Sequence, residues 1–152
     1  MDGSESTLCV RATLSLDARP GVVAQALSWL ADTAEQGRWS ASLTRRLTLC
    51  LDEALSNILM HGFKTHAATE SRRIHLRILQ GADRTAVDII DNGMPFDPSR
   101  IALPPLAGSV DDARQGGHGL RLMRHYLDEI HYEHRDRHNH LRLVVHASVP
   151  RP

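Results

Sequence analysis

The sequence contains a single lysine, Lys64, and its other basic residues are arginines. The 18 basic and 18 acidic residues give a formal net charge of +0, whereas a nucleic-acid or anionic-membrane surface would need a basic excess. The two cysteines, Cys9 and Cys50, are too few for a disulfide framework or a zinc site, and both look like core positions. No apolar run approaches the roughly 18 residues of a membrane-spanning helix, and residues 1–6 do not resemble a signal peptide. We therefore expect a cytoplasmic protein without a nucleic-acid or membrane partner.

The composition is that of a globular protein, with 41% hydrophobic and 24% charged residues. No repeat or linker divides the chain, so we expect one domain over residues 1–152. Hydrophobic periodicity predicts the elements of this domain. Alternating apolar and polar residues predict strands at 8–16, 72–80, 85–91, 131–136 and 140–149. Spacings of three and four residues predict helices at about 17–35, 43–62 and 120–130.

Capping and turn residues mark the ends of these elements. Asp17 is placed to cap the first helix and Ser40 or Ser42 the second, which Gly62 ends. Residues 81–84 join the second and third strands as a hairpin. The order β-α-α-β-β-loop-α-β-β predicts a two-layer α+β sandwich, in which helices cover one face of a mixed, mostly antiparallel sheet.

Three polar residues follow one ridge of the second predicted helix, because Glu53, Asn57 and His61 are spaced by four residues. The amide oxygen of Asn57 could ligate Mg²⁺, which prefers oxygen ligands. The carboxylate of Glu53 could accept a proton from a hydroxyl group or water. The alternative is a solvated helix face, and the spacing alone does not decide between the two.

A second cluster, Asp91–Pro98, begins directly after an apolar strand. Gly93 would let a ligand approach the backbone closely, and Asp91 could accept a hydrogen bond from an exocyclic amine such as that of adenine. The alternative is an Asx turn, which Asp-Asn-Gly forms readily. Residues 92–117 then show no periodicity, and a loop of that length is usually functional.

A third cluster places glycines before the last predicted helix. Gly116, Gly117 and Gly119 would expose N–H groups at the positive end of the helix dipole, which favours anion binding. The alternative is a flexible hinge. The sequence contains no GxxxxGK[ST], and no strand directly precedes these glycines, which excludes a P-loop and the dinucleotide fingerprint.

In this order, the three clusters resemble the motifs of the GHKL ATPase superfamily. Residues 51–62 (LDEALSNILMHG) look like its N box, residues 91–98 like its first glycine box and residues 117–123 like its second. The motif Glu-Ala-x-x-Asn-x-x-x-His-Gly is similar to that of the anti-sigma-factor serine/threonine kinases. The resemblance covers about residues 8–149 and implies the Bergerat ATP-binding fold, with an ATP lid at about 97–116.

The resemblance also implies a role for each residue that matches a motif. Glu53 would be the general base, Asn57 would ligate Mg²⁺ and Asp91 would accept a hydrogen bond from the adenine amine. Gly93 would leave room for the purine, and His61 would lie near the rim of the pocket.

The phosphates of ATP would be bound by main-chain N–H groups of the second glycine box, at Gly117, Gly119 and Leu120. A lid arginine, Arg100 or Arg114, could close on the γ-phosphate, and no motif decides which. The implied cofactors are ATP and Mg²⁺.

The implied activity is transfer of the γ-phosphate to a serine or threonine of an anti-sigma-factor antagonist of the STAS type. In this family the kinase also sequesters a sigma factor, in a partner-switching pathway. Relatives dimerise through the first strand and the helix after it, so we expect a homodimer. Two alternatives stay open: a regulator that binds nucleotide without turnover, and the catalytic domain of a split histidine kinase.

The last two predicted strands carry two further features. Asn139-His140 stands where relatives often have Gly-Thr, which puts a hydroxyl contact near the adenine in doubt. Four histidines invite a metal-site interpretation, but neither HExxH nor a Cys/His spacing supports it. We expect them on an exposed face of the sheet; they are His131, His134, His138 and His140.

Overall fold

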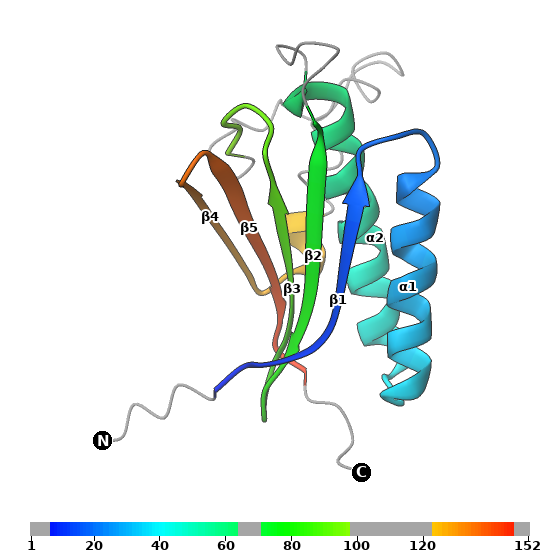
Figure 1. Cartoon of the computed structure of the whole chain (residues 1–152). Coiled ribbons are helices and arrows are strands. Elements are labelled where there is room, and N and C mark those ends of the chain that lie inside the picture. The colour runs from blue at the N-terminus through cyan, green and yellow to red at the C-terminus, as the bar shows by residue number, and fades with distance from the viewer. Residues whose placement is uncertain (1–6, 64–70, 98–122, 148–152) are drawn as a thin grey trace, which may run out of the picture.

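Two long helices pack on one face of a five-stranded sheet in a computed structural model of the chain (Figure 1). The structure describes residues 7–63, 71–97 and 123–147. The elements are, in chain order, β1 (Cys9–Asp17), α1 (Val22–Gln36), α2 (Ala41–Asn57), the π-helical turn η1 (Ile58–Gly62), β2 (Arg73–Gln80), β3 (Thr85–Asp91), β4 (Glu129–Arg135) and β5 (His138–Val145). This confirms the predicted order of strands and helices, and most of the predicted long loop lies outside the described residues. None of the described helices has the length and apolar character needed to cross a membrane.

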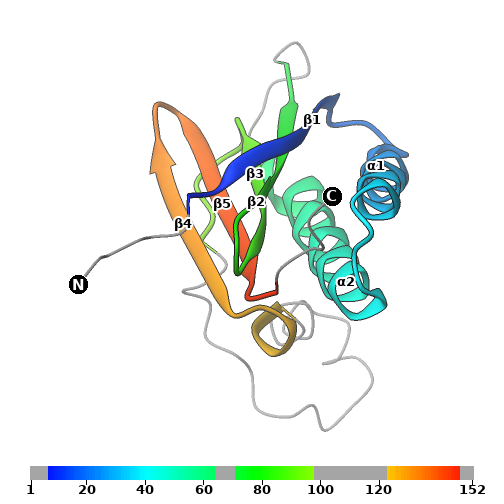
Figure 2. The ribbon, with the colours of Figure 1, turned by 90° about the horizontal axis from the view of Figure 1, so that it is seen from below.

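The sheet has the strand order β1-β2-β3-β5-β4, so β1 and β4 form its edges. Every pairing among the described strands is antiparallel, in keeping with the predicted mixed, mostly antiparallel sheet. Seen from below, α1 and α2 lie on the same side of the sheet (Figure 2). The predicted two-layer sandwich is therefore confirmed.

The hydrophobic core lies between this sheet and the helices. Leu30 of α1 and Leu51 of α2 are fully buried in one cluster with Leu76 of β2 and Ile89 of β3. Burying a side chain of this size stabilises a fold by about 1.5–3 kcal/mol. Cys50 belongs to the same cluster, as predicted.

Two predictions near the N-terminus are wrong. Cys9 is exposed because it begins an edge strand. Asp17 does not cap α1, because it still belongs to β1, where it pairs with Arg73. The residue before α1 is Gly21, with φ at 92°, and no side chain caps the helix there.

The ends of the other two helices are set by local hydrogen bonds. Ser40 caps α2 as predicted, since its Oγ accepts a bond of 3.0 Å from the N–H of Leu43. The helix after the long loop ends at residue 126, and the prediction that it continues to about 130 is wrong. The N–H of Asp128 already donates to the carbonyl of Val144 at 2.9 Å, so the chain has joined the sheet there.

The open face of the sheet, away from the helices, carries a cluster of charged side chains. Asp88 of β3 lies between Arg77 of β2 and Arg142 of β5, with N–O distances of 2.7 and 2.6 Å. The carboxylate is almost fully buried between these two side chains, although it lies on the uncovered face.

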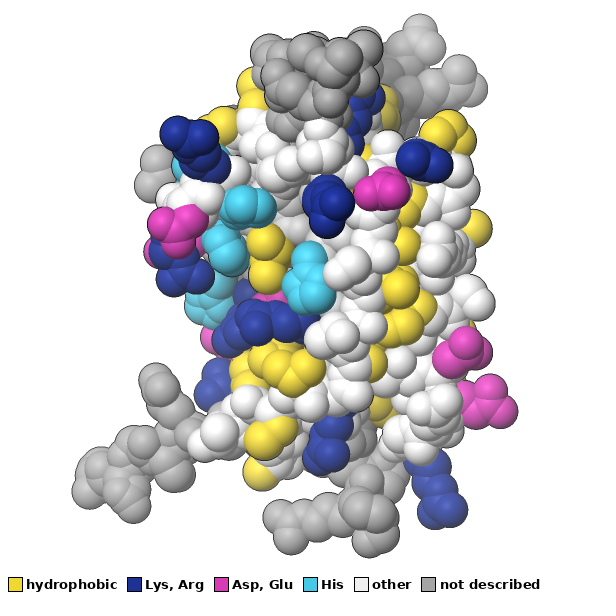
Figure 3. All heavy atoms as spheres, in the orientation of Figure 1, with side chains coloured by type: hydrophobic (Ala, Val, Ile, Leu, Met, Phe, Trp, Pro, Cys, Tyr) yellow, Lys and Arg dark blue, Asp and Glu magenta, His cyan; other side chains and the backbone are white. Residues whose placement is uncertain are grey.

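Histidine side chains gather on this open face beside the arginines (Figure 3). The strand register confirms the predicted placement for His131, His138 and His140. His134 instead points to the other face, where its Nδ1 lies 3.2 Å from Oδ1 of Asn139. In the described part of the chain, no three His, Cys, Asp or Glu side chains are placed to hold a metal ion.

Candidate active site

A small pocket opens between the C-terminal end of α2 and the adjacent ends of β3 and β5. Two of the predicted site residues line it: Asn57, the last residue of α2, and Asp91, the last residue of β3. The remaining lining is mainly apolar or aromatic and consists of Ala54, Ile58, Phe96, Met123, Tyr132, Asn139 and Leu141. The fold thus brings two motifs that are distant in sequence to one cavity.

Glu53 and His61 lie beside this pocket rather than in its lining. Glu53 is half-buried one turn before Asn57, and burial, together with the neighbouring charge of Asp52, raises its pKa. The ring of His61 stacks on Phe96, with 5.9 Å between the ring centroids, so it packs behind a residue that does line the pocket. Gly117, Gly119 and Leu120 lie outside the described residues, as do Arg100 and Arg114.

The two motifs touch through their backbones. The N–H of Met94 donates to the carbonyl of Gly62 at 2.7 Å, which joins the end of η1 to the loop after β3. A Cβ atom on Gly93 would lie 2.5 Å from that carbonyl oxygen and 2.9 Å from Oδ1 of Asp91. Real Cβ atoms do not approach so closely, and the contact therefore requires glycine at position 93.

Asp91 lies at the floor of the pocket and is 3% exposed. Its Oδ1 accepts hydrogen bonds from the N–H of Gly93 at 2.9 Å and from Nδ2 of Asn139 at 3.0 Å. Burial raises the pKa of this carboxyl group, and the two hydrogen bonds oppose the rise. The bonds also fix the orientation of the side chain.

Asn139, noted from the sequence only as a departure from relatives, is a further residue of the site. It is 4% exposed and lies beside Asp91 because the two positions pair across β3 and β5. One sequence signal could have found it: alternation with Leu141, Leu143 and Val145 places position 139 on the inward face. A polar residue on an inward face needs hydrogen-bond partners, which mark a network.

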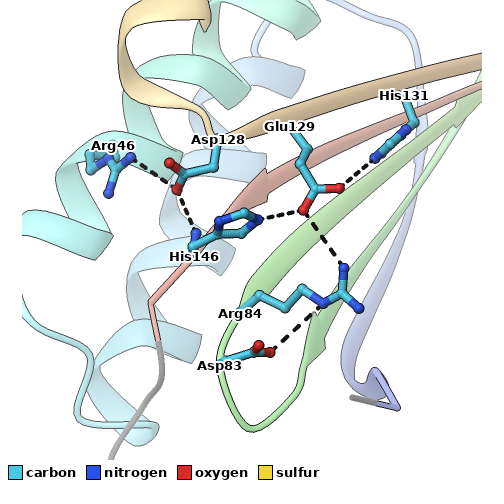
Figure 4. A network of polar contacts seen from close by, with 7 residues as sticks. All are labelled: Arg46, Asp83, Arg84, Asp128, Glu129, His131 and His146. Atoms are coloured by element: carbon cyan, nitrogen blue, oxygen red, sulfur yellow. Dashed lines mark hydrogen bonds and ion pairs between the residues drawn. The ribbon is translucent and has the colours of Figure 1, made fainter. Parts of the chain in front are cut away.

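A second network holds the chain where it enters β4, after the helical residues 123–126 (Figure 4). Nε of Arg46, on α2, donates to the carbonyl of Tyr126 at 2.7 Å, and its Nη2 lies 3.3 Å from Oδ2 of Asp128. The N–H of His146 donates to the same Oδ2 at 2.6 Å. These contacts hold the chain just after the helical residues 123–126, which include Met123 of the pocket lining.

Glu129 extends this network onto the sheet. Its carboxylate contacts Nε2 of His131 at 2.9 Å, Nε2 of His146 at 2.5 Å and a guanidinium nitrogen of Arg84 at 3.7 Å. The hydrogen bonds from the two histidines lower the pKa of Glu129. The start of β4 is therefore held by charged contacts as well as by strand pairing.

The residues that line the pocket offer the kinds of contact that a flat heterocycle with an amine would make. The side chains of Ile58, Met123 and Leu141 offer apolar surface, and the single carboxylate at the floor is a hydrogen-bond acceptor. Among the described residues, no hydrogen-bond partner is found for the carboxamide of Asn57 or the carboxylate of Glu53, so both groups remain available. An available carboxamide oxygen at the pocket fits a Mg²⁺ ligand, since Mg²⁺ takes oxygen donors.

Comparison with known proteins agrees with this geometry. Residues 16–145 match the histidine kinase-like ATPase domain. The serine/threonine-protein kinase BtrW of Bordetella bronchiseptica is 46% identical over 137 residues, which cover 90% of this chain and 94% of the relative. The serine-protein kinase RsbW of Listeria monocytogenes is 27% identical over 129 residues, covering 82% of this chain and 80% of the relative.

A crystal structure of the RsbU and RsbW domains of Rv1364c from Mycobacterium tuberculosis shares the fold, with a TM-score of 0.60 at 15% identity. The match covers 93% of this chain and 34% of that longer one. The family match over most of the chain and the high identity to BtrW decide the classification. The chain belongs to the histidine kinase-like ATPase domain family, as a member of its serine/threonine-protein kinase branch.

Proposed function

We propose that this chain transfers the γ-phosphate of Mg·ATP to a serine or threonine of an anti-sigma-factor antagonist of the STAS type. The observation that carries the proposal is the meeting of Asn57 and Asp91 in one pocket with apolar walls. Asp91 supplies a hydrogen-bond acceptor for the amine of the adenine base. Asn57 supplies a ligand for the Mg²⁺ ion that accompanies the phosphates. The kinase names of the relatives supply the reaction class.

Each predicted residue has one task in this reaction. Asp91 accepts a hydrogen bond from the adenine amine at the pocket floor, and the purine lies against the apolar walls. Gly117, Gly119 and Leu120 donate main-chain N–H bonds to the phosphates. Asn57 ligates Mg²⁺, which, when bound, offsets the negative charge of the phosphates.

Glu53 acts on the incoming hydroxyl group. Its carboxylate takes the hydroxyl proton as the serine or threonine oxygen forms a bond to the γ-phosphorus. The bond between that phosphorus and the β,γ-bridging oxygen breaks, and ADP leaves. The raised pKa of Glu53 makes the ionised form a stronger base than an exposed glutamate.

The partners of the proposal are those of a partner-switching system. The unphosphorylated antagonist competes for the kinase, which otherwise sequesters a sigma factor, and phosphorylation of the antagonist ends that competition. We propose that the kinase acts in the cytoplasm as a homodimer. The serine-protein kinase RsbW among the relatives supports the kinase part of this assignment.

The test is a transfer assay with purified chain, γ-labelled ATP and a candidate STAS antagonist. We expect acid-stable label on the antagonist, and we expect Glu53→Gln and Glu53→Ala both to abolish transfer while ATP binding persists. Glu53→Gln is the matched variant, because it keeps the shape of the side chain and removes only its basicity.

Three outcomes would overturn parts of this proposal. Transfer by Glu53→Gln at a rate near that of the wild type would exclude the general-base role. Bound ATP without label on any partner would favour the regulator that does not turn over. Acid-labile label on a separate histidine-containing hairpin protein would favour the split histidine kinase.

A further inference from the structure

A directional hydrogen-bond chain runs through residues of the pocket lining and ends on Asp91. Asn139 donates from Nδ2 to Oδ1 of Asp91 at 3.0 Å, to the carbonyl of Met94 at 2.9 Å and to the carbonyl of Gly93 at 3.3 Å. All three partners are acceptors, so the NH₂ group of Asn139 must face them. A flipped amide would place its oxygen against three other oxygens.

The other end of the same amide is fixed by Tyr132. The hydroxyl group of Tyr132 donates to Oδ1 of Asn139 and accepts a bond of 3.1 Å from the N–H of Phe96. Burial raises the pKa of Tyr132, so the hydroxyl keeps the proton that it donates. The direction of donation therefore runs from Phe96 through Tyr132 and Asn139 to Asp91.

Within residues 7–63, 71–97 and 123–147, both hydrogen bonds that reach the Asp91 carboxylate end on Oδ1, and neither uses Oδ2. We propose that Asn139 is a positioning residue for base recognition: it pins Oδ1 and so presents Oδ2 to the exocyclic amine of the purine. This inference rests on the proposed role of Asp91 in nucleotide binding. It adds a residue, and a reason for adenine specificity, that the motifs do not contain.

Asn139 also holds the loop that follows β3. The same NH₂ group that orients Asp91 holds the Gly93 and Met94 carbonyls, in the loop that follows β3. A single hydroxyl group at this position would have one proton and could serve one acceptor at a time, whereas the amide has two protons for its three acceptors. The amide of Asn139 therefore holds the Asp91 carboxylate and the loop after β3 together.

The test measures discrimination between two nucleotides in the full-length chain. Calorimetry gives the Kd of ATP and of purine riboside triphosphate, which lacks only the 6-amine. For the wild type we expect ATP to bind roughly tenfold to a hundredfold more tightly, as for a hydrogen bond to a charged acceptor. We expect Asn139→Ala to lower this ratio to about threefold or less, because Asp91 loses its fixed orientation.

Three variants make the result specific. Tyr132→Phe removes one hydroxyl group, so it should lower the ratio less than Asn139→Ala and provides a second test if the alanine variant does not fold. Asn139→Thr should restore part of the ratio, since its hydroxyl group can still donate to Asp91. His140→Gln, on the neighbouring open-face position, should leave the ratio unchanged.

The possible failures are distinguishable. If Asn139→Ala weakens the binding of both nucleotides equally and keeps the wild-type ratio of their Kd values, Asn139 has only a structural role and the inference is wrong. If the wild type itself does not discriminate between the two nucleotides, the proposed role of Asp91 is wrong and the inference falls with it. A lowered ratio in Asn139→Ala and Tyr132→Phe, with partial recovery in Asn139→Thr, supports the inference.

Discussion

The carbonyl oxygen of Gly62 lies only 2.5 Å from the place that a Cβ atom on Gly93 would occupy. The end of η1 and the loop after β3 are therefore in backbone contact, and no side chain separates them. This contact sets the distance between the Asn57 side of the pocket and the Asp91 side.

Replacing Gly93 by alanine should force these two segments apart. We expect Gly93→Ala to lower the free energy of unfolding by about 1–3 kcal/mol, as for other overpacked sites, and to weaken ATP binding. Urea denaturation and calorimetry measure the two effects. The matched control is Gly62→Ala, whose Cβ would meet Ile58 Cγ2 at an ordinary 3.5 Å and should cost little. Equal stability of the two variants would contradict the prediction.

Asp91→Asn should keep the hydrogen bonds that hold this side chain in the fold but weaken the binding of ATP. The asparagine oxygen can keep the bonds from Gly93 and Asn139, while its NH₂ group replaces Oδ2 and would face the amine of the base. We expect the Kd for ATP to rise at least tenfold.

The same substitution has a pH signature. Burial raises the pKa of Asp91 above its ordinary 3.8, so the carboxyl group favours folding most below that value. This contribution is lost as pH rises through the folded-state pKa. Asp91→Asn removes the titration, and its stability relative to the wild type should increase between pH 4 and pH 8 in urea denaturation. A difference that does not change with pH would show that burial of this charge costs nothing.

Asp52→Asn should move the pH profile of phosphoryl transfer. Burial and the charge of Asp52 raise the pKa of Glu53, and transfer needs the ionised carboxylate, so the rate falls as pH falls through that pKa. Removing the charge lowers the pKa of Glu53, and the acidic limb of kcat should shift to lower pH.

The control for this variant is Ser56→Ala. Ser56 donates to Oδ1 of Asp52 at 3.3 Å, and the asparagine variant retains an oxygen there. Ser56→Ala removes the hydrogen bond and keeps the charge, so its acidic limb should stay where the wild type has it. If Asp52→Asn does not shift the acidic limb of the pH profile of kcat, Glu53 is excluded as the titrating base.

Local patterns predicted the helices and strands well because periodicity reflects which side chains are buried. The predicted hairpin at 81–84 is confirmed, since the N–H of Gly81 donates to the carbonyl of Arg84 at 2.8 Å between β2 and β3. The same reasoning failed where one pattern suits two structures. Leu127 and Ile130 fit helical spacing, yet Ile130 belongs to β4 and packs on the core from the sheet.

The candidate site also contains residues that the sequence predicts and a residue whose role it does not predict. Asn57 and Asp91 could be found because each belongs to a short motif, and the structure places both in one pocket. The role of Asn139 could not be found, because its partners come from the loop after β3 and from β4. Such a network depends on the strand order β3-β5-β4, which no local pattern encodes.

The edge position of β4 has a consequence for solubility. An edge strand leaves unpaired N–H and C=O groups that can recruit a strand from another molecule. The outward positions of β4 carry Glu129, His131, Glu133 and Arg135, which alternate along its open face. A second molecule that added a strand here would have to desolvate these groups, so this end of the sheet resists edge-to-edge aggregation.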